Sequence, residues 1–248
     1  MDTIKSRLKQ FKLSGIRANL EERLSYAKES SLAYEEFLEL LLEDEQNNRA
    51  HNSYKKRYAK AKLPYAKTLE DFDFSFQPSI DRRKINDCAT CRFVKEAKNL
   101  IFIGPPGVGK SHLSVSIAIK ALSKGYRVLF SKVSDMLQDL HFSRADNSYY
   151  SRLKYYLTPD LLVLDELGFK KVPAYSADDF FEVISKRYEK GSVIITTNKT
   201  FEAWNDIFAD AILASAIIDR IVHHSLVVKI SGKSYRSKNI KKGGGSER

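Results

Sequence analysis

Cysteine is scarce in this chain of 248 residues, occurring only as Cys88 and Cys91. One CxxC pair without nearby histidines supplies at most half of the ligands of a structural zinc site. No βαβ unit precedes the pair, which argues against a thioredoxin-like redox motif. We therefore expect two free thiols in a reducing compartment.

Long apolar runs are also lacking. No segment approaches the roughly 18 apolar residues that cross a bilayer, and no apolar signal region stands near the N-terminus. The sequence therefore predicts a soluble cytoplasmic protein without a membrane partner.

Acidic residues are fewer than basic ones: the chain has 31 Asp and Glu and 42 Lys and Arg, which gives a formal net charge of +11 and a pI near 9.4. Such an excess favours an anionic partner, most commonly nucleic acid, although a solvated basic surface is the simpler alternative. The hydrophobic content of 43% is sufficient for a real core.

The chain is expected to begin with a small all-helical domain over residues 1–67. Apolar residues recur there at helical spacing, first from Ile4 to Leu24 and then from Tyr34 to Leu42. An extended linker lying on the next domain is expected over 68–80, because "TLEDFDFSFQPS" alternates aromatic and polar residues. The tail 239–248, which includes "KKGGGSER", is expected to be disordered.

Residues 81–238 are predicted to form a larger α/β domain. A helix is expected over 81–97 and another over 110–124. The apolar runs "LIFIG", "RVLFS", "LLVLDE" and "SVIITTN" lack the polar alternation of half-exposed strands, and "LVVKI" is a fifth candidate. These runs predict a three-layer fold around a five-stranded parallel sheet.

The stretch "GPPGVGKS" follows the first of these runs and opens a helix, which is the context of a phosphate-binding P-loop. Its glycines let successive backbone N–H groups turn toward phosphate oxygens, and the helix N-terminus adds its dipole. Lys110 would reach the β- and γ-phosphates, and Ser111 would bind Mg²⁺. The predicted nucleotide contacts are Gly104, Pro105, Pro106, Gly107, Val108, Gly109, Lys110, Ser111 and His112.

Two acids end the run "LLVLDE". Asp165 fits the second magnesium-binding position, and Glu166 is placed to polarise the attacking water as general base. Asn198 ends the next predicted strand, so in a parallel sheet it would stand beside both groups and orient the water or touch the γ-phosphate. The simpler alternatives are a helix-capping acid and an ordinary turn asparagine.

These motifs occur together with "EEFLELLLEDEQNNR", "AKLPYAKTLEDFDFS", "FEVISKRYEKGSVIITTNKTFEAWNDIF" and "AIIDR" followed by "SYR". In combination they resemble the IstB-type transposition helper ATPases, of the initiator and helicase-loader branch of the AAA+ proteins. The resemblance covers nearly the whole chain. It implies an AAA+ core without a separate C-terminal lid, with ATP and Mg²⁺ as cofactors.

The resemblance also implies an ATP-dependent homo-oligomer on double-stranded DNA, which deforms the target and recruits a cognate transposase. Arg220 in "IIDRI" would be the trans-acting arginine finger, and Arg236 in "SYR" a sensor-like arginine near the nucleotide. In related initiators a second arginine often follows the first by four positions, where this chain has His224. For both arginines a surface ion pair is the alternative.

Two basic segments are candidates for DNA contact, mainly through the phosphate backbone. On a helix, Arg49, Lys56 and Lys60 fall within about 40° of one another. The first candidate set is Arg49, Lys55, Lys56, Arg57 and Lys60. The second set, within "SRADNSYYSRLKYY", is Arg144, Arg152 and Lys154. Both sets have a solvated helix face as the alternative interpretation.

Two other functions share this core. A replicative helicase loader of the DnaC type would handle single strands and bind a helicase through its N-terminus. A structural DNA clamp would use ATP without needing turnover. The N-terminal and linker blocks favour the transposition helper, and the acid at Glu166 argues against a pure clamp.

Overall fold

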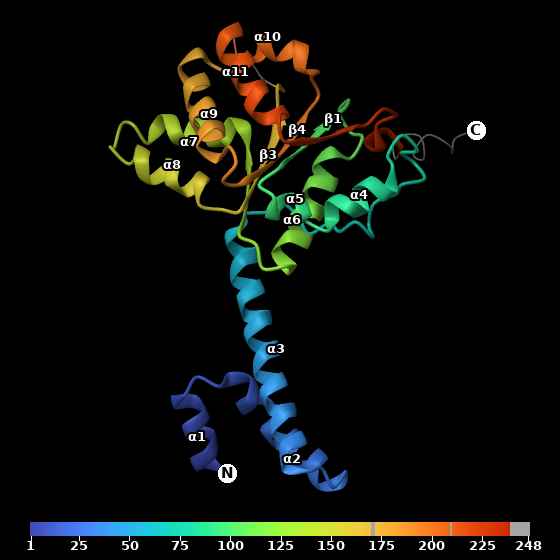
Figure 1. Cartoon of the computed structure of the whole chain (residues 1–248), viewed down its shortest axis with the longest axis vertical. Helices are drawn as coiled ribbons and strands as arrows, with labels where there is room; N and C mark the ends of the chain where they lie inside the picture. Colours follow the sequence, from blue (N-terminus) through green and yellow to red (C-terminus); the bar gives the residue numbers. More distant parts are fainter. Residues whose placement is uncertain (170–171, 209, 239–248) are drawn as a thin grey trace, which may run out of the picture. The chain divides into compact units, whose positions relative to one another are not determined.

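The computed structural model describes residues 1–169, 172–208 and 210–238 (Figure 1). The chain divides into an N-terminal unit, Met1–Lys56, and a C-terminal unit, Arg57–Arg248. The division falls within a helix, before the boundary predicted at residue 67. The predicted disordered tail 239–248 lies outside the described residues.

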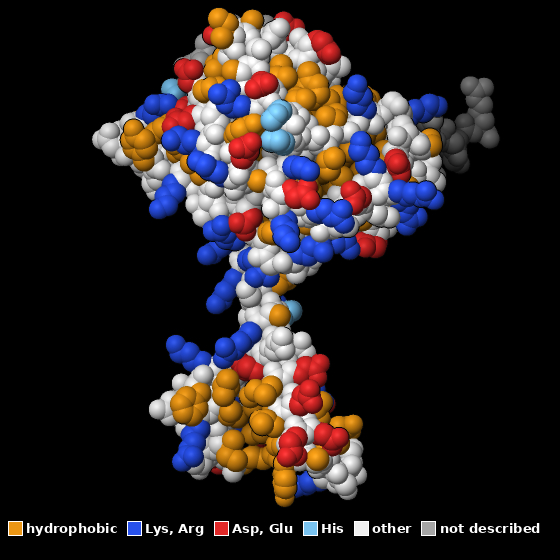
Figure 2. All heavy atoms as spheres, viewed as in Figure 1, with side chains coloured by type: hydrophobic (Ala, Val, Ile, Leu, Met, Phe, Trp, Pro, Cys, Tyr) orange, Lys and Arg blue, Asp and Glu red, His pale blue; other side chains and the backbone are white. Residues whose placement is uncertain are grey.

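The N-terminal unit consists of α1 (Asp2–Gln10), α2 (Ser14–Glu29) and most of α3 (Tyr34–Lys60). Its small core is formed by Ile16, Leu20 and Leu41. The helical prediction for this region is confirmed. Figure 2 shows hydrophobic side chains gathered on one face of this unit.

Gly15 lets α2 approach α3 closely. A Cβ at this position would lie 2.6 Å from the carbonyl oxygen of Asp44 and 2.7 Å from Cα of Glu45. The Gly15 N–H donates to Oε2 of Glu45 at 2.6 Å, and Arg23 donates twice to Asp44 at 2.8 Å. The two buried acids of α3 are therefore compensated by α2, as buried charges must be.

The C-terminal unit is built on a five-stranded parallel sheet, as predicted, and its strand order is β2-β3-β4-β1-β5. Its strands are β1 (Asn99–Ile103), β2 (Val128–Lys132), β3 (Leu161–Leu167), β4 (Ser192–Thr197) and β5 (Ser225–Lys229). All residues of β1 and β4 are buried, which explains the continuous apolar runs.

Helices cover both faces of the sheet (Figure 1). One face carries α4 (Arg82–Ala89), α5 (Arg92–Lys95) and α6 (Lys110–Ser123). The other carries α7 (Val133–Phe142), α8 (Tyr149–Leu157), α9 (Ala174–Arg187), α10 (Asn205–Phe208) and α11 (Ala211–Val222). Short 3₁₀ helices span η1 (Phe201–Trp204) and η2 (Tyr235–Lys238). This is the predicted three-layer architecture.

The single helix expected over 81–97 is wrong, because the chain breaks between α4 and α5. Cys91 adopts a left-handed backbone conformation there, with φ of 59°. Cys88 and Cys91 are both free and buried, as expected for structural thiols. Burial raises the pKa of each thiol to about 11, so neither is a reactive thiolate near neutral pH.

The C-terminal end of α3 covers the edge strand β2. The N–H of Phe130 donates to the carbonyl of Ala61 at 2.8 Å, and Ala61 is completely buried. The guanidinium N–H groups of Arg57 donate hydrogen bonds to the carbonyl of Leu122 at the end of α6. The Phe130–Ala61 bond thus pairs one position of an edge that would otherwise be open to another chain.

No helix in the described ranges has the length and apolar character needed to cross a membrane.

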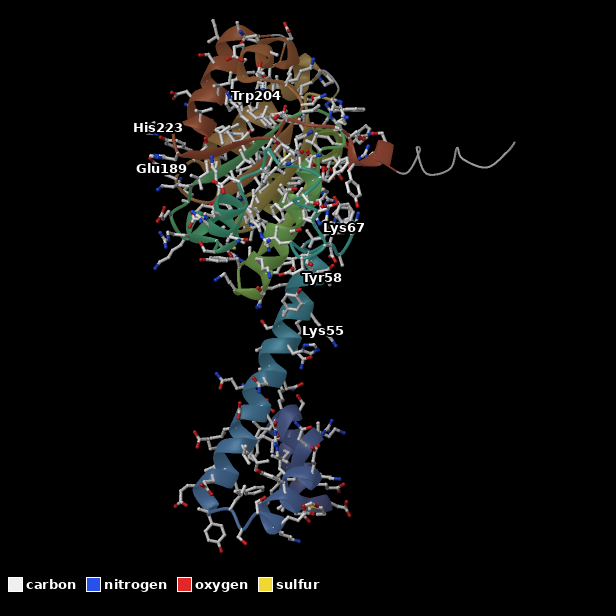
Figure 3. The ribbon with its side chains drawn as sticks, turned by 90° about the vertical axis from the view of Figure 1, so that its right-hand side faces the viewer. Lys55, Tyr58, Lys67, Glu189, Trp204 and His223 are labelled. Atoms are coloured by element: carbon white, nitrogen blue, oxygen red, sulfur yellow. The ribbon has the colours of Figure 1, made fainter. Side chains whose placement is uncertain are left out.

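Replacing Gly15 with alanine is expected to destabilise the N-terminal unit by about 1–3 kcal/mol, because the added methyl group overlaps the α3 backbone. Urea unfolding followed by helical circular dichroism should show an earlier transition. The only tryptophan, Trp204, is buried in the C-terminal unit (Figure 3), so its fluorescence transition should not move. Unchanged dichroism would contradict the close approach.

Candidate nucleotide-binding site

The P-loop joins the end of β1 to the start of α6, as the sequence predicts. Gly107 and Gly109 have φ of 80° and 98°, a conformation that favours glycine. The N–H of Gly104 donates to the carbonyl of Thr197 at 3.1 Å, which fixes the loop beside the end of β4. Nζ of Lys110 donates to the carbonyls of Gly104 and Pro105 at 2.7 and 2.8 Å.

Asp165 joins the P-loop helix to the strand ends. The Ser111 hydroxyl donates to Oδ1 of Asp165 at 2.8 Å, and the Thr196 hydroxyl donates to the same oxygen. Asp165 is only 4% exposed. The hydroxyl and carboxylate oxygens brought together here are hard ligands of the kind that Mg²⁺ prefers, so the donor set fits that ion.

Glu166 follows at an irregularity in the pairing of β3 with β4 between Leu164 and Leu167. Its φ is 65°, and its N–H donates to the Thr196 hydroxyl at 3.0 Å. Such bulges turn a side chain away from the regular alternation of a strand. The Glu166 carboxylate is 42% exposed and pairs with Nζ of Lys132, at the end of β2, at 2.9 Å.

Asn198 directly follows β4, one residue after the carbonyl that holds the P-loop. Its Oδ1 is buried and has no hydrogen-bond partner among the described residues. A buried amide oxygen without a partner is costly, and a ligand or water would relieve that cost.

A cavity of about 600 Å³ opens at the P-loop. Nucleotide-sized ligands occupy cavities of this scale. It is lined by Tyr65, Ala66, Lys67, Asp71, Phe72, Asp73, Gln77, Gly107, Val108, Gly109, Lys110, Ser111, His112, Tyr235 and Arg236. Of the predicted loop contacts, residues 107–112 line this cavity, whereas Gly104, Pro105 and Pro106 are not among the lining residues.

The predicted linker forms one wall of this cavity. It folds through turns rather than lying extended, and His112 Nε2 donates to the carbonyl of Thr68 at 2.8 Å. The Phe72 ring stands edge-on to the His112 ring with centroids 5.2 Å apart. A Cβ at Gly109 would come within 2.5 Å of the Phe72 ring. Burial first, and then the charge of Asp165, raises the pKa of Tyr65 to about 12.

The C-terminal segment also lines the cavity and contacts the linker, since the Phe76 and Tyr235 ring centroids are 5.1 Å apart. The Tyr235 N–H donates to the carbonyl of Gly107 at 2.9 Å, and Arg236 lines the cavity. Partial burial lowers the pKa of Lys110, the positive charge of Arg236 lowers it further, and Asp165 opposes both. The sensor-like role of Arg236 stays a prediction.

Arg220 lies on α11 and is not among the lining residues. Its guanidinium stands over the Phe181 ring at 4.8 Å and donates to the carbonyl of Ala216 at 2.9 Å. Its predicted action on a neighbouring subunit stays a prediction.

Some of the residues predicted to contact DNA already form hydrogen bonds or ion pairs within the chain, and others are exposed. Arg49 pairs with Glu45 at 2.7 Å, and Arg57 binds the end of α6. Lys55, Lys56 and Lys60 are exposed on α3 (Figure 3 labels Lys55).

The second predicted set is engaged in a similar way. Arg144 pairs with the buried Asp179 at 2.5 Å, and Arg152 pairs with Asp139 at 3.5 Å. Lys154 is exposed. The adjacent tyrosines differ: Tyr156 is buried and its hydroxyl donates to Asp139 at 2.9 Å, whereas Tyr150 is exposed.

A family model described as an IstB-like ATP binding protein matches residues 6–243 of this chain. The chain belongs to the IstB family. A putative ATP-binding protein of insertion sequence IS21 from Pseudomonas aeruginosa is 39% identical over 237 residues, covering 96% of this chain and 89% of the relative. The corresponding IS232 protein of Bacillus thuringiensis is also 39% identical, covering 94% of this chain and 93% of its own.

Solved structures show the same fold. The DnaC helicase loader is 27% identical, with a TM-score of 0.51, covering 71% of this chain and 99% of that chain. A replication initiator DnaA bound to AMPPCP and single-stranded DNA is 22% identical, with a TM-score of 0.57, covering 73% of this chain and 55% of that chain. The IstB-family protein is thus an ATP-binding protein with the AAA+ fold.

Two parts of the site are not predicted from the sequence. The cavity wall formed by residues 65–77 is predicted mainly as a linker, although its aromatic residues are a usable signal. Lys132, the partner of Glu166, stands at the end of a predicted strand without a motif to mark it.

Replacing Phe72 with alanine is expected to weaken binding of a fluorescent ATP analogue by about fivefold, because a ring contact of this kind contributes on the order of 1 kcal/mol. Equilibrium fluorescence titration measures the effect. Phe142→Ala is a matched control, since Phe142 is exposed and absent from the cavity lining. Equal affinity of both variants would exclude a role for Phe72 in nucleotide binding.

Proposed function

We propose that this IstB-family protein hydrolyses ATP as a DNA-dependent oligomer that prepares a target for its transposase. The carrying observation is the junction of Ser111, Asp165 and Thr196, with Glu166 beside it. It unites the phosphate-binding helix with a buried acid and a further carboxylate, which is the arrangement that phosphoryl transfer to water needs.

Ser111 and Asp165 would hold Mg²⁺, which supplies positive charge that neutralises the phosphate oxygens. Lys110 would leave the loop carbonyls to bind the β- and γ-phosphates. Glu166 would orient and deprotonate the attacking water, and Asn198 would hold that water or the γ-phosphate through its amide. The pair with Lys132 at 2.9 Å would hold the Glu166 carboxylate in position until ATP binds.

The insertion-sequence origin of the relatives supports a role in transposition. Double-stranded DNA as partner is supported by the net charge of +11 and the exposed lysines on α3. Membership of the IstB family supports three further parts of the proposal: deformation of target DNA, recruitment of the transposase and a trans-acting Arg220. The helicase-loader alternative shares the core but has no such support among the insertion-sequence relatives.

ATP turnover is expected to rise with duplex DNA and more than linearly with protein concentration, because a finger supplied by a neighbour can contribute on the order of 10³ in rate. A phosphate-release assay at several protein concentrations, with and without DNA, measures this. Lys110→Ala is the control and should remove turnover throughout. Turnover indifferent to both DNA and concentration would refute the assembly mechanism.

Replacing Glu166 with glutamine should lower turnover about 100-fold or more while leaving ATP binding intact, since general-base catalysis is removed and the shape is kept. ATP-bound complexes should then persist on duplex DNA, as seen by sedimentation or native electrophoresis. Lys132→Met serves as a comparison, because it removes the ion pair but keeps the carboxylate. Unchanged turnover in the glutamine variant would remove Glu166 from its role.

A further inference from the structure

A group of cations on the C-terminal unit has no part in the nucleotide site. It consists of Lys60, Arg92, Lys95, Lys98 and Lys124, which we call the amino-edge patch. All five side chains are exposed. Figure 2 shows Lys and Arg side chains gathered along the border of this unit.

The fold brings these residues together from three segments. The bond of Arg57 to the carbonyl of Leu122 sets the last turn of α3, which carries Lys60, beside the end of α6, where Lys124 follows. Helices α4 and α6 pack together, and α5 follows α4 after the turn at Cys91. Lys98 directly precedes β1 and Lys124 lies between α6 and β2, so both stand at the edge where the parallel strands begin.

A single acid lies within the α5 part of the patch. A hydrogen bond from Lys98 lowers the pKa of Glu96, and the charges of Arg92 and Lys95 lower it further. The Lys98–Glu96 distance is 2.8 Å, and both side chains are more than 40% exposed. Three cations thus surround one carboxylate, so the region keeps a positive excess.

The surrounding sequence adds to that excess. Between residues 57 and 132 the chain holds more than twice as many Lys and Arg as Asp and Glu. The aromatic residue within α5, Phe93, is 3% exposed and offers no ring for base stacking. The cations of α5 therefore have no exposed ring within their own helix, which suits the phosphates of a duplex better than the bases of a single strand.

We propose that the amino-edge patch binds the phosphate backbone of double-stranded DNA, without reading its sequence. The inference rests on the proposed DNA-binding function and deepens it by naming a surface on the core. It joins Lys60 to Arg92, Lys95, Lys98 and Lys124, of which Lys98 pairs with Glu96. It is separate from the surface of Arg144 and Arg152, where both arginines pair with acids.

The position of the patch leaves the nucleotide site accessible. Lys110 stands at the first turn of α6, and Lys124 follows its last turn. A helix of 14 residues is about 20 Å long. DNA on the patch and ATP at the P-loop can therefore be bound at the same time by the same unit.

The test is duplex binding by the full chain, measured by fluorescence anisotropy of a labelled random-sequence duplex at several salt concentrations with ATP present. The triple variant Arg92→Gln, Lys95→Gln, Lys98→Gln is expected to bind at least tenfold more weakly. Its log–log salt dependence should be less steep by roughly 0.9 for each phosphate that the variant no longer neutralises. Glu96→Gln should bind more tightly than the wild type.

The matched control is Lys9→Gln, Arg17→Gln, Lys28→Gln, which removes the same charge from exposed positions of the N-terminal unit. It should keep the wild-type salt slope. Titration with a fluorescent ATP analogue shows whether the patch variant is folded, since the nucleotide site lies at the other end of α6.

The outcomes separate the two proposals. If the wild type binds duplex DNA and the patch variant matches it in affinity and slope, the patch inference is overturned and the proposed function stands. A control variant that weakens as much as the patch variant overturns the patch as well, because net charge alone then explains binding. A wild type that does not bind duplex DNA overturns both.

Discussion

The hydrogen bonds that join Ser111, Asp165 and Thr196 are the constraint on which the site depends. They tie the first turn of α6 to the ends of β3 and β4, three segments that are distant in the sequence. They work because all strands run parallel, so every strand ends at the same edge. A buried carboxylate there has to be saturated by donors, and each donor it recruits also positions a reactive group.

The nucleotide cavity adds a second constraint, because its walls are formed by one segment that precedes the P-loop in the sequence and one that follows it. Phe72 precedes the P-loop and packs against Gly109, whereas Tyr235 lies far beyond it and binds Gly107. Both glycines therefore serve two purposes: they adopt left-handed backbone angles, and they leave room for a neighbouring segment. A ligand in the cavity would contact three separate parts of the chain, so binding would hold those parts together.

The parts of the site that sequence could predict are those fixed by local patterns or by strand topology. The P-loop needs only its own glycines, and Asp165 and Asn198 follow from the rule that parallel strands share one edge. Contacts between segments that are remote in the sequence could not be predicted, because the spacing of apolar residues contains no information about them. The Lys132–Glu166 pair, the docking of Arg57 on α6 and the break of a helix at Cys91 belong to this class.

The same distinction applies to charge. The net charge of +11 predicts an anionic partner but says nothing about where it binds. The structure narrows the choice of surface, because some cations already have partners within the chain. These include Arg49, Arg57 and Arg144. The exposed lysines and arginines of the amino-edge patch lie at the edge where the strands begin, opposite the edge where they end at the nucleotide. Helix α6 spans the distance between the two, so a phosphate-bearing ligand at each end would act on the same rigid element.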